Sequence, residues 1–203
     1  MCKPWTSKAF TVAAFLMLAT LTLGVVGYVI GGEPPGWFFP TMFALFGATV
    51  LAGVTGLAGL YEALRHPAPR LARAGLVLAG LAALGAMGWV GIALTGRPPW
   101  EIGGAFYGIV VGGGLATFLA GSLVLGIAAL RTAVLPRAVG TLLVIGGLTF
   151  LIPITATTLV GQPVEWLPFT VLAVWVVVFG GNGALLRRPV ATEVGEGLPL
   201  GSG

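Results

Sequence analysis

The 203-residue chain has few of the residues on which catalysis and metal binding usually depend. It contains one histidine and one cysteine, and only 8% of its residues are charged. A single cysteine excludes an internal disulfide, and a single histidine gives neither a zinc ligand set nor a b-type haem held from both faces. The chain also lacks the sets of residues needed for Ser-His-Asp hydrolysis and for thiol redox chemistry. We therefore expect no enzyme, no metal and no cofactor.

The chain is unusually rich in apolar residues. It is 57% hydrophobic with a mean hydropathy of +1.04, beyond the range of soluble domains. Its 34 glycines are spread through the apolar runs, as is typical of membrane helices. The formal charge of +4 does not indicate nucleic-acid binding, because the basic residues stand in ones and twos beside apolar segments. The composition predicts an all-α integral membrane protein whose immediate partner is the lipid bilayer.

Six apolar segments are each long enough to cross a bilayer, which takes about 20 residues. The first segment follows two lysines, as a signal peptide would, but it is too long for a signal core and no A-x-A-like site ends it. We interpret it as an uncleaved helix. The predicted segments are 9–31, 40–61, 73–95, 104–130, 138–160 and 168–186, which form one domain over 1–188, followed by a disordered tail over 189–203.

The basic residues predict an orientation, because cytoplasmic loops are enriched in Lys and Arg. In the six-helix arrangement, only Arg97 lies on the outer side. We therefore expect a multi-pass protein of the plasma or inner membrane with both termini in the cytoplasm. The basic residues assigned to the inner side are Lys3, Lys8, Arg65, Arg70, Arg73, Arg131, Arg137, Arg187 and Arg188.

A short pattern recurs in the three predicted outer loops. They read GEPPGW from Gly32, GRPPWE from Gly96 and GQPVEW from Gly161, and the three glycines are almost equally spaced. Each copy predicts a helical hairpin that enters from the same side, so the repeats are parallel and could surround a pseudo-threefold axis. Because Gly and Pro are common in all turns, triplication is a hypothesis.

Each outer loop also carries one carboxylate and one tryptophan, which supports two interpretations. Around a common axis the carboxylates could form an acidic mouth that attracts cations, as in channels. Alternatively, the tryptophans belong to the aromatic belt of the membrane interface and the glutamates are ordinary loop residues. Arg97, which aligns with Glu33, weakens an all-acidic ring. The candidate mouth residues are Glu33, Trp37, Arg97, Trp100, Glu101, Glu165 and Trp166.

Polar residues inside the apolar segments form a second set of candidates. Pro153 interrupts the fifth segment and leaves the carbonyl of Thr149 without its usual partner. A broken helix can mark a transport site, although proline kinks are common in membrane bundles. Asn182 is expected to hydrogen-bond to a neighbouring helix. The set comprises Thr149, Pro153, Thr155, Thr157, Thr158 and Asn182.

Small residues recur every four positions along the fourth segment, and such a stripe lets another helix backbone approach closely. A shorter stripe on the second segment, formed by Ala48, Ala52 and Gly56, could meet it. Internal packing is the default interpretation, and contact within a homo- or hetero-oligomer is the alternative. The longer stripe comprises Gly104, Gly108, Gly112, Ala116 and Ala120.

One acidic residue, Glu62, lies at the inner end of an apolar segment. It precedes Arg65 by three residues, which predicts an ion pair between neighbouring turns of one helix. A proton-relay role would instead require Glu62 to face a cavity.

Two classes of function follow from these patterns. The uncharged segments, the small-residue stripe and the short loops favour a non-enzymatic membrane subunit or scaffold. Pro153, the nearby threonines and the outer glutamates favour a small-solute permease or channel with a pseudo-threefold outer mouth.

Overall fold

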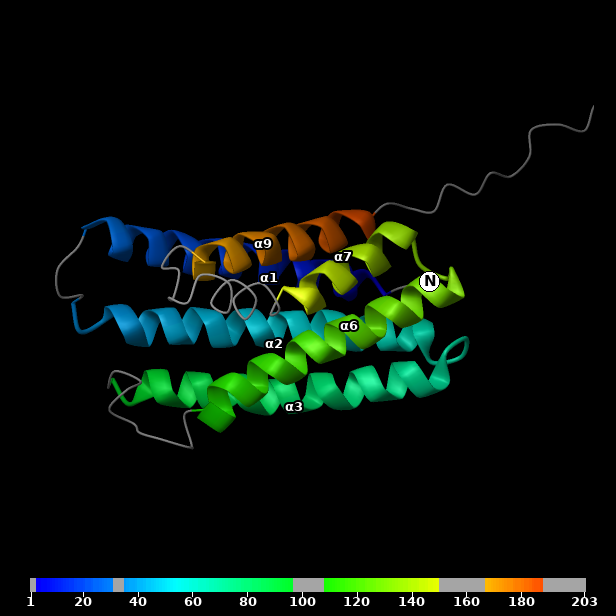
Figure 1. Ribbon diagram of the computed structural model, residues 1–203, viewed down its shortest axis with the longest axis horizontal. Coiled ribbons are helices and arrows are strands. Elements are labelled where there is room, and N and C mark those ends of the chain that lie inside the picture. The colour runs from blue at the N-terminus through cyan, green and yellow to red at the C-terminus, as the bar shows by residue number, and fades with distance from the viewer. Residues whose placement is uncertain (1–2, 31–34, 97–107, 150–166, 188–203) are drawn as a thin grey trace, which may run out of the picture.

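The computed structural model describes residues 3–30, 35–96, 108–149 and 167–187, and their regular structure is entirely helical (Figure 1). This confirms the predicted all-α class. The elements are α1 (Pro4–Ile30), α2 (Phe38–Leu64), α3 (Pro69–Leu94), the π-helix η1 (Gly108–Gly113), which continues into α6 (Gly114–Thr132), then α7 (Arg137–Leu148) and α9 (Leu167–Leu185).

Five helical stretches of the described residues are long and apolar enough to cross a membrane: α1, α2, α3, η1 with α6, and α9. The fifth predicted segment, 138–160, is described only through α7, which has 12 residues, and through Thr149. Many large apolar side chains point away from the protein, among them Phe15 and Leu94, which are 69% and 83% exposed. Such a surface is compatible with a lipid environment.

The observed helix ends differ from the predicted ones by a few residues. The first helix begins at Pro4 rather than near residue 9, because proline is tolerated in a first turn and Lys8 can remain exposed at the surface. The third helix likewise begins at Pro69. Helix α6 ends where Ala133 adopts a left-handed conformation with φ 51°. The chain then turns into α7.

The helices form a ring in chain order. Helix α1 packs against α2 and α9, α3 packs against α2 and α6, and α7 packs against α6 and α9. Helix α6 is tilted across the bundle and also contacts α2, as Figure 1 shows. The arrangement places neighbours in sequence beside one another in space.

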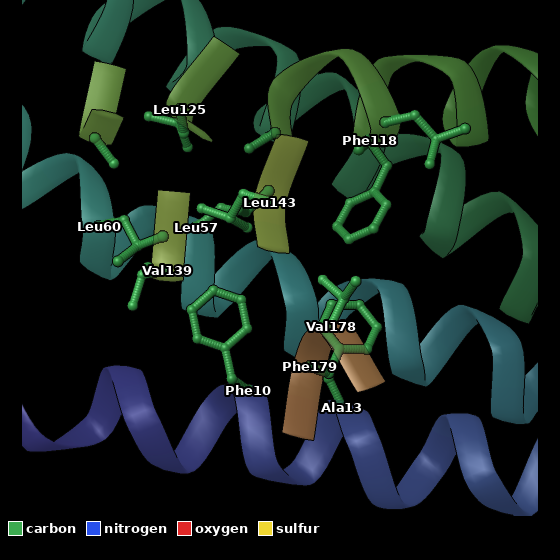
Figure 2. Close-up of a cluster of buried hydrophobic side chains, with 14 of the residues drawn as sticks. Phe10, Ala13, Leu57, Leu60, Phe118, Leu125, Val139, Leu143, Val178 and Phe179 are labelled. Atoms are coloured by element: carbon green, nitrogen blue, oxygen red, sulfur yellow. The ribbon is translucent and has the colours of Figure 1, made fainter. Parts of the chain in front are cut away.

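The interior of the described bundle is filled with apolar side chains. Phe10 of α1, Phe118 of α6 and Phe179 of α9 belong to one cluster of buried side chains (Figure 2). The ring centroids of Phe10 and Phe179 are 6.3 Å apart, and those of Trp175 and Phe179 are 4.9 Å apart. All four side chains are at most 3% exposed. The centre is therefore packed along the helices that the structure describes.

Candidate helix-docking face and polar interior

One side of the η1–α6 stretch is held tightly against α3. The Trp89 indole Nε1 donates a hydrogen bond of 3.2 Å to the carbonyl oxygen of Val110 in the π-helix. Close backbone approach accompanies this bond, since a Cβ added to Gly85 would collide with the backbone of Gly114. A Cβ on Gly88 would collide with the side chain of Val110. Val110 and Gly114 therefore define the face turned toward α3.

The described members of the predicted stripe do not share that face. A Cβ added to Gly108 or Gly112 would meet no described residue within 4 Å, and Ala116, one turn further on, is exposed. We call Gly108, Gly112 and Ala116 the small-residue face. Ala120 is half-buried, and Gly104 lies outside the described residues.

The prediction that the stripe packs inside the protein is therefore wrong for Gly108, Gly112 and Ala116. Gly114 and Gly121 make the close approach to α3 instead. In the shorter stripe on α2, Gly56 packs against the ring of Phe10 of α1. Helix periodicity explains the difference: Gly112 and Gly114 are two residues apart and point to nearly opposite sides, whereas Gly114 and Gly121 are seven residues apart and share one side.

The structure describes two residues of the intramembrane polar set, Thr149 and Asn182. Thr149 is the C-cap residue of α7. Its side chain is 2% exposed, and its hydroxyl donates to the carbonyl of Gly146 at 2.6 Å. The hydroxyl also accepts a hydrogen bond of 3.0 Å from Nε1 of Trp175, which links α7 to α9. Sequence analysis did not find this partner, because Trp175 is remote in the chain. Pro153, Thr155, Thr157 and Thr158 lie outside the described residues.

Asn182 is fully buried on α9, but the described residues do not supply the predicted hydrogen bond to a neighbouring helix. Neither its side-chain oxygen nor its side-chain nitrogen has a hydrogen-bond partner among them. The hydroxyl of Thr6 on α1, also fully buried, shares this property. These are the unsatisfied buried side-chain groups within the described part of the chain.

Glu62 has a different ion-pair partner from the predicted Arg65. Its Oε2 lies 2.8 Å from Nζ of Lys3, and the two side chains are 39% and 57% exposed. An exposed pair of this kind contributes about 0–1 kcal/mol. The pair forms because α1 starts early enough to place Lys3 beside the end of α2.

Of the candidate outer-mouth residues, the structure describes Trp37 alone. It precedes α2, is 60% exposed, and its ring centroid lies 6.3 Å from that of Phe38. An exposed tryptophan at a helix end suits the aromatic belt of a membrane interface. The other candidates, Glu33, Arg97, Trp100, Glu101, Glu165 and Trp166, lie outside the described residues.

No family model, no curated protein and no solved structure matches this chain. The described residues include no group of three or more histidine, cysteine, aspartate or glutamate side chains placed to hold a metal ion.

Proposed function

We propose that this protein is a non-enzymatic membrane subunit or scaffold that binds an apolar helix of another membrane protein through its small-residue face. The observation that carries the proposal is that no described residue lies in front of Gly108 and Gly112, on a helix that is anchored to α3 by its other side. The anchored side keeps the face in place and leaves it accessible.

A face of small residues favours helix association in lipid. Lipid tails are as apolar as leucine, so helices gain little from leaving them, and association depends on close van der Waals contact and on hydrogen bonds. Glycine and alanine let the partner backbone come close enough for such contact. The same chain uses this principle internally, where Gly85 of α3 meets Gly114 of α6.

The filled interior also favours a scaffold over a permanent conduit. Phe10, Phe118, Trp175 and Phe179 occupy the centre of the described bundle, and the buried polar side chains there are limited to Thr, Ser and Asn. A conduit for ions needs charged or carbonyl groups along its path.

For topology, we propose that the end of the bundle carrying Lys3 and Arg187 lies in the cytoplasm, with six crossings of the cell membrane. Cytoplasmic loops are enriched in Lys and Arg. Reporter fusions after Arg70 and after Gly103 are expected to report opposite sides of the membrane, and a fusion after Arg187 the same side as Arg70. If Arg70 and Gly103 report one compartment, the hairpin topology is wrong.

A large side chain introduced on the small-residue face tests whether this face binds a partner helix. Leucine in place of Gly112 is expected to weaken the association at least about tenfold, which corresponds to about 1.4 kcal/mol of lost close contact. The experiment purifies the tagged full-length protein from its native membrane in mild detergent. It then measures the amount of co-purified protein and the mass of the complex, which distinguishes a second copy from a different protein.

The matched control is Gly80→Leu on α3. Gly80 also has nothing within 4 Å of an added Cβ, but it lies outside the small-residue face. This variant should keep the complex. A wild-type protein that purifies as a lone monomer, or a Gly112→Leu variant that behaves like Gly80→Leu, contradicts the proposal.

A further inference from the structure

The basic residues of the described part of the chain gather at one end of the bundle. Helices α1, α3 and α7 begin at this end, and α2, α6 and α9 end there (Figure 1). Glu62, which pairs with Lys3, is the one acidic residue among the described residues. This end therefore has a large excess of positive charge. Its basic residues are Lys3, Lys8, Arg65, Arg70, Arg73, Arg131, Arg137 and Arg187.

Two of these cations meet at the contact between α1 and α9. Nη2 of Arg187 donates a hydrogen bond of 3.0 Å to Oγ1 of Thr11 on α1. Lys8 precedes Thr11 by three residues, so the two side chains are neighbours on the surface of α1. The helices are antiparallel, and Gly183 lies against Thr11. Arg187 lies four residues beyond Gly183 and therefore reaches about the depth of Lys8.

Neither cation has a carboxylate partner among the described residues. Lys8 and Arg187 are both exposed, and the one described carboxylate, that of Glu62, is paired with Lys3 between α1 and α2. The hydrogen bond to Thr11 uses one N–H of the guanidinium, which has further N–H groups for another acceptor. The hydroxyl of Thr11 itself donates within its own helix, so it holds Arg187 in place rather than binding an anion.

An exposed apolar surface continues from the two cations toward the middle of α1 and α9. Phe15 follows Lys8 by seven residues, which is about two turns, so it lies on the same side of α1, and it is 69% exposed. Val177 of α9 is 63% exposed and precedes Gly180, which lies near Ala14, by three residues. Apolar side chains from both helices therefore lie deeper in the bilayer than the cations, where acyl chains would contact them.

We propose that Lys8 and Arg187 bind the phosphate of an anionic phospholipid whose acyl chains lie along Phe15 and Val177. Ammonium and guanidinium groups form charge-assisted hydrogen bonds with phosphate. Basic residues at the membrane surface also attract anionic lipids. A zwitterionic lipid offers the same phosphate, but its cationic group is repelled by the positive charge at this end of the bundle. The site therefore selects a lipid with a net negative headgroup.

Native mass spectrometry of the full-length protein in mild detergent measures this selectivity. The protein is titrated with phosphatidylglycerol and, separately, with phosphatidylcholine that has the same acyl chains. Phosphatidylglycerol is expected to bind at least about fivefold more tightly. Equal affinities contradict the proposal. So does displacement of the bound lipid by inorganic phosphate at the lipid's own concentration, because the site would then take free phosphate.

Charge removal tests whether these two residues form the site. Lys8→Gln and Arg187→Gln are each expected to weaken phosphatidylglycerol binding at least about threefold, whereas Lys8→Arg, which keeps the charge, should bind it like the wild type. The matched control is Arg70→Gln, which removes an exposed charge at the same end from α3, a helix that packs against α2 and α6. Its affinity should change by less than about twofold. An equal loss in Arg70→Gln and Lys8→Gln would indicate diffuse attraction to the whole end and would overturn the proposal.

Discussion

Valine in place of Gly85 is expected to destabilise the protein by about 3 kcal/mol, the upper part of the range for overpacking. An added Cβ at this position collides with the Cα of Gly114, which is backbone and cannot rotate away. Helices α3 and α6 would have to separate, and the hydrogen bond from Trp89 to Val110 would lengthen from 3.2 Å. Reversible unfolding with SDS in mixed micelles, followed by circular dichroism, measures the free energy of unfolding.

Gly91→Val supplies the control on the same helix. A Cβ at Gly91 meets nothing within 4 Å, so its substitution should change the free energy of unfolding by less than about 0.5 kcal/mol. Because valine is a better helix former than glycine, any small change should be stabilising. Equal losses in the two variants would show that backbone contact at Gly85 does not hold α3 against α6.

The sequence predicted the all-helical class because long apolar runs leave few alternatives in a membrane. It also predicted most helix positions to within a few residues. It did not predict which face of the fourth segment is internal. Small residues occur on both sides of this segment, and Gly112 and Gly114 lie on opposite sides, so spacing alone does not say that Gly114 rather than Gly112 meets α3.

Local sequence patterns also did not predict interactions between residues that are remote in the chain. The spacing of Glu62 and Arg65 favours a local ion pair, whereas the structure pairs Glu62 with Lys3 from another helix. Asn182 was recognisable as a polar residue in an apolar segment. That it finds no partner among the described residues depends on which side chains of other helices pack against α9, which local patterns do not specify.

Alanine in place of Phe179 is expected to cost about 3 kcal/mol, the lower end of the range for removing a buried aromatic ring. In lipid the transfer term is small, because the lost ring would be as well solvated by lipid tails as by the core. The cavity and the lost contacts remain: Phe179 is 1% exposed, and its ring packs against those of Phe10, Phe118 and Trp175. The same unfolding measurement applies.

Phe15→Ala is the corresponding change on the outer surface. Phe15 is 69% exposed on α1, so its removal takes away contacts with lipid rather than with the protein, and the free energy of unfolding should change by less than about 0.5 kcal/mol. The contrast between the two phenylalanines measures how far the packed centre stabilises the ring of helices. If Phe179→Ala is no more harmful than Phe15→Ala, the aromatic layer does not hold α1, α6 and α9 together. A scaffold held together by its aromatic centre would then be disfavoured.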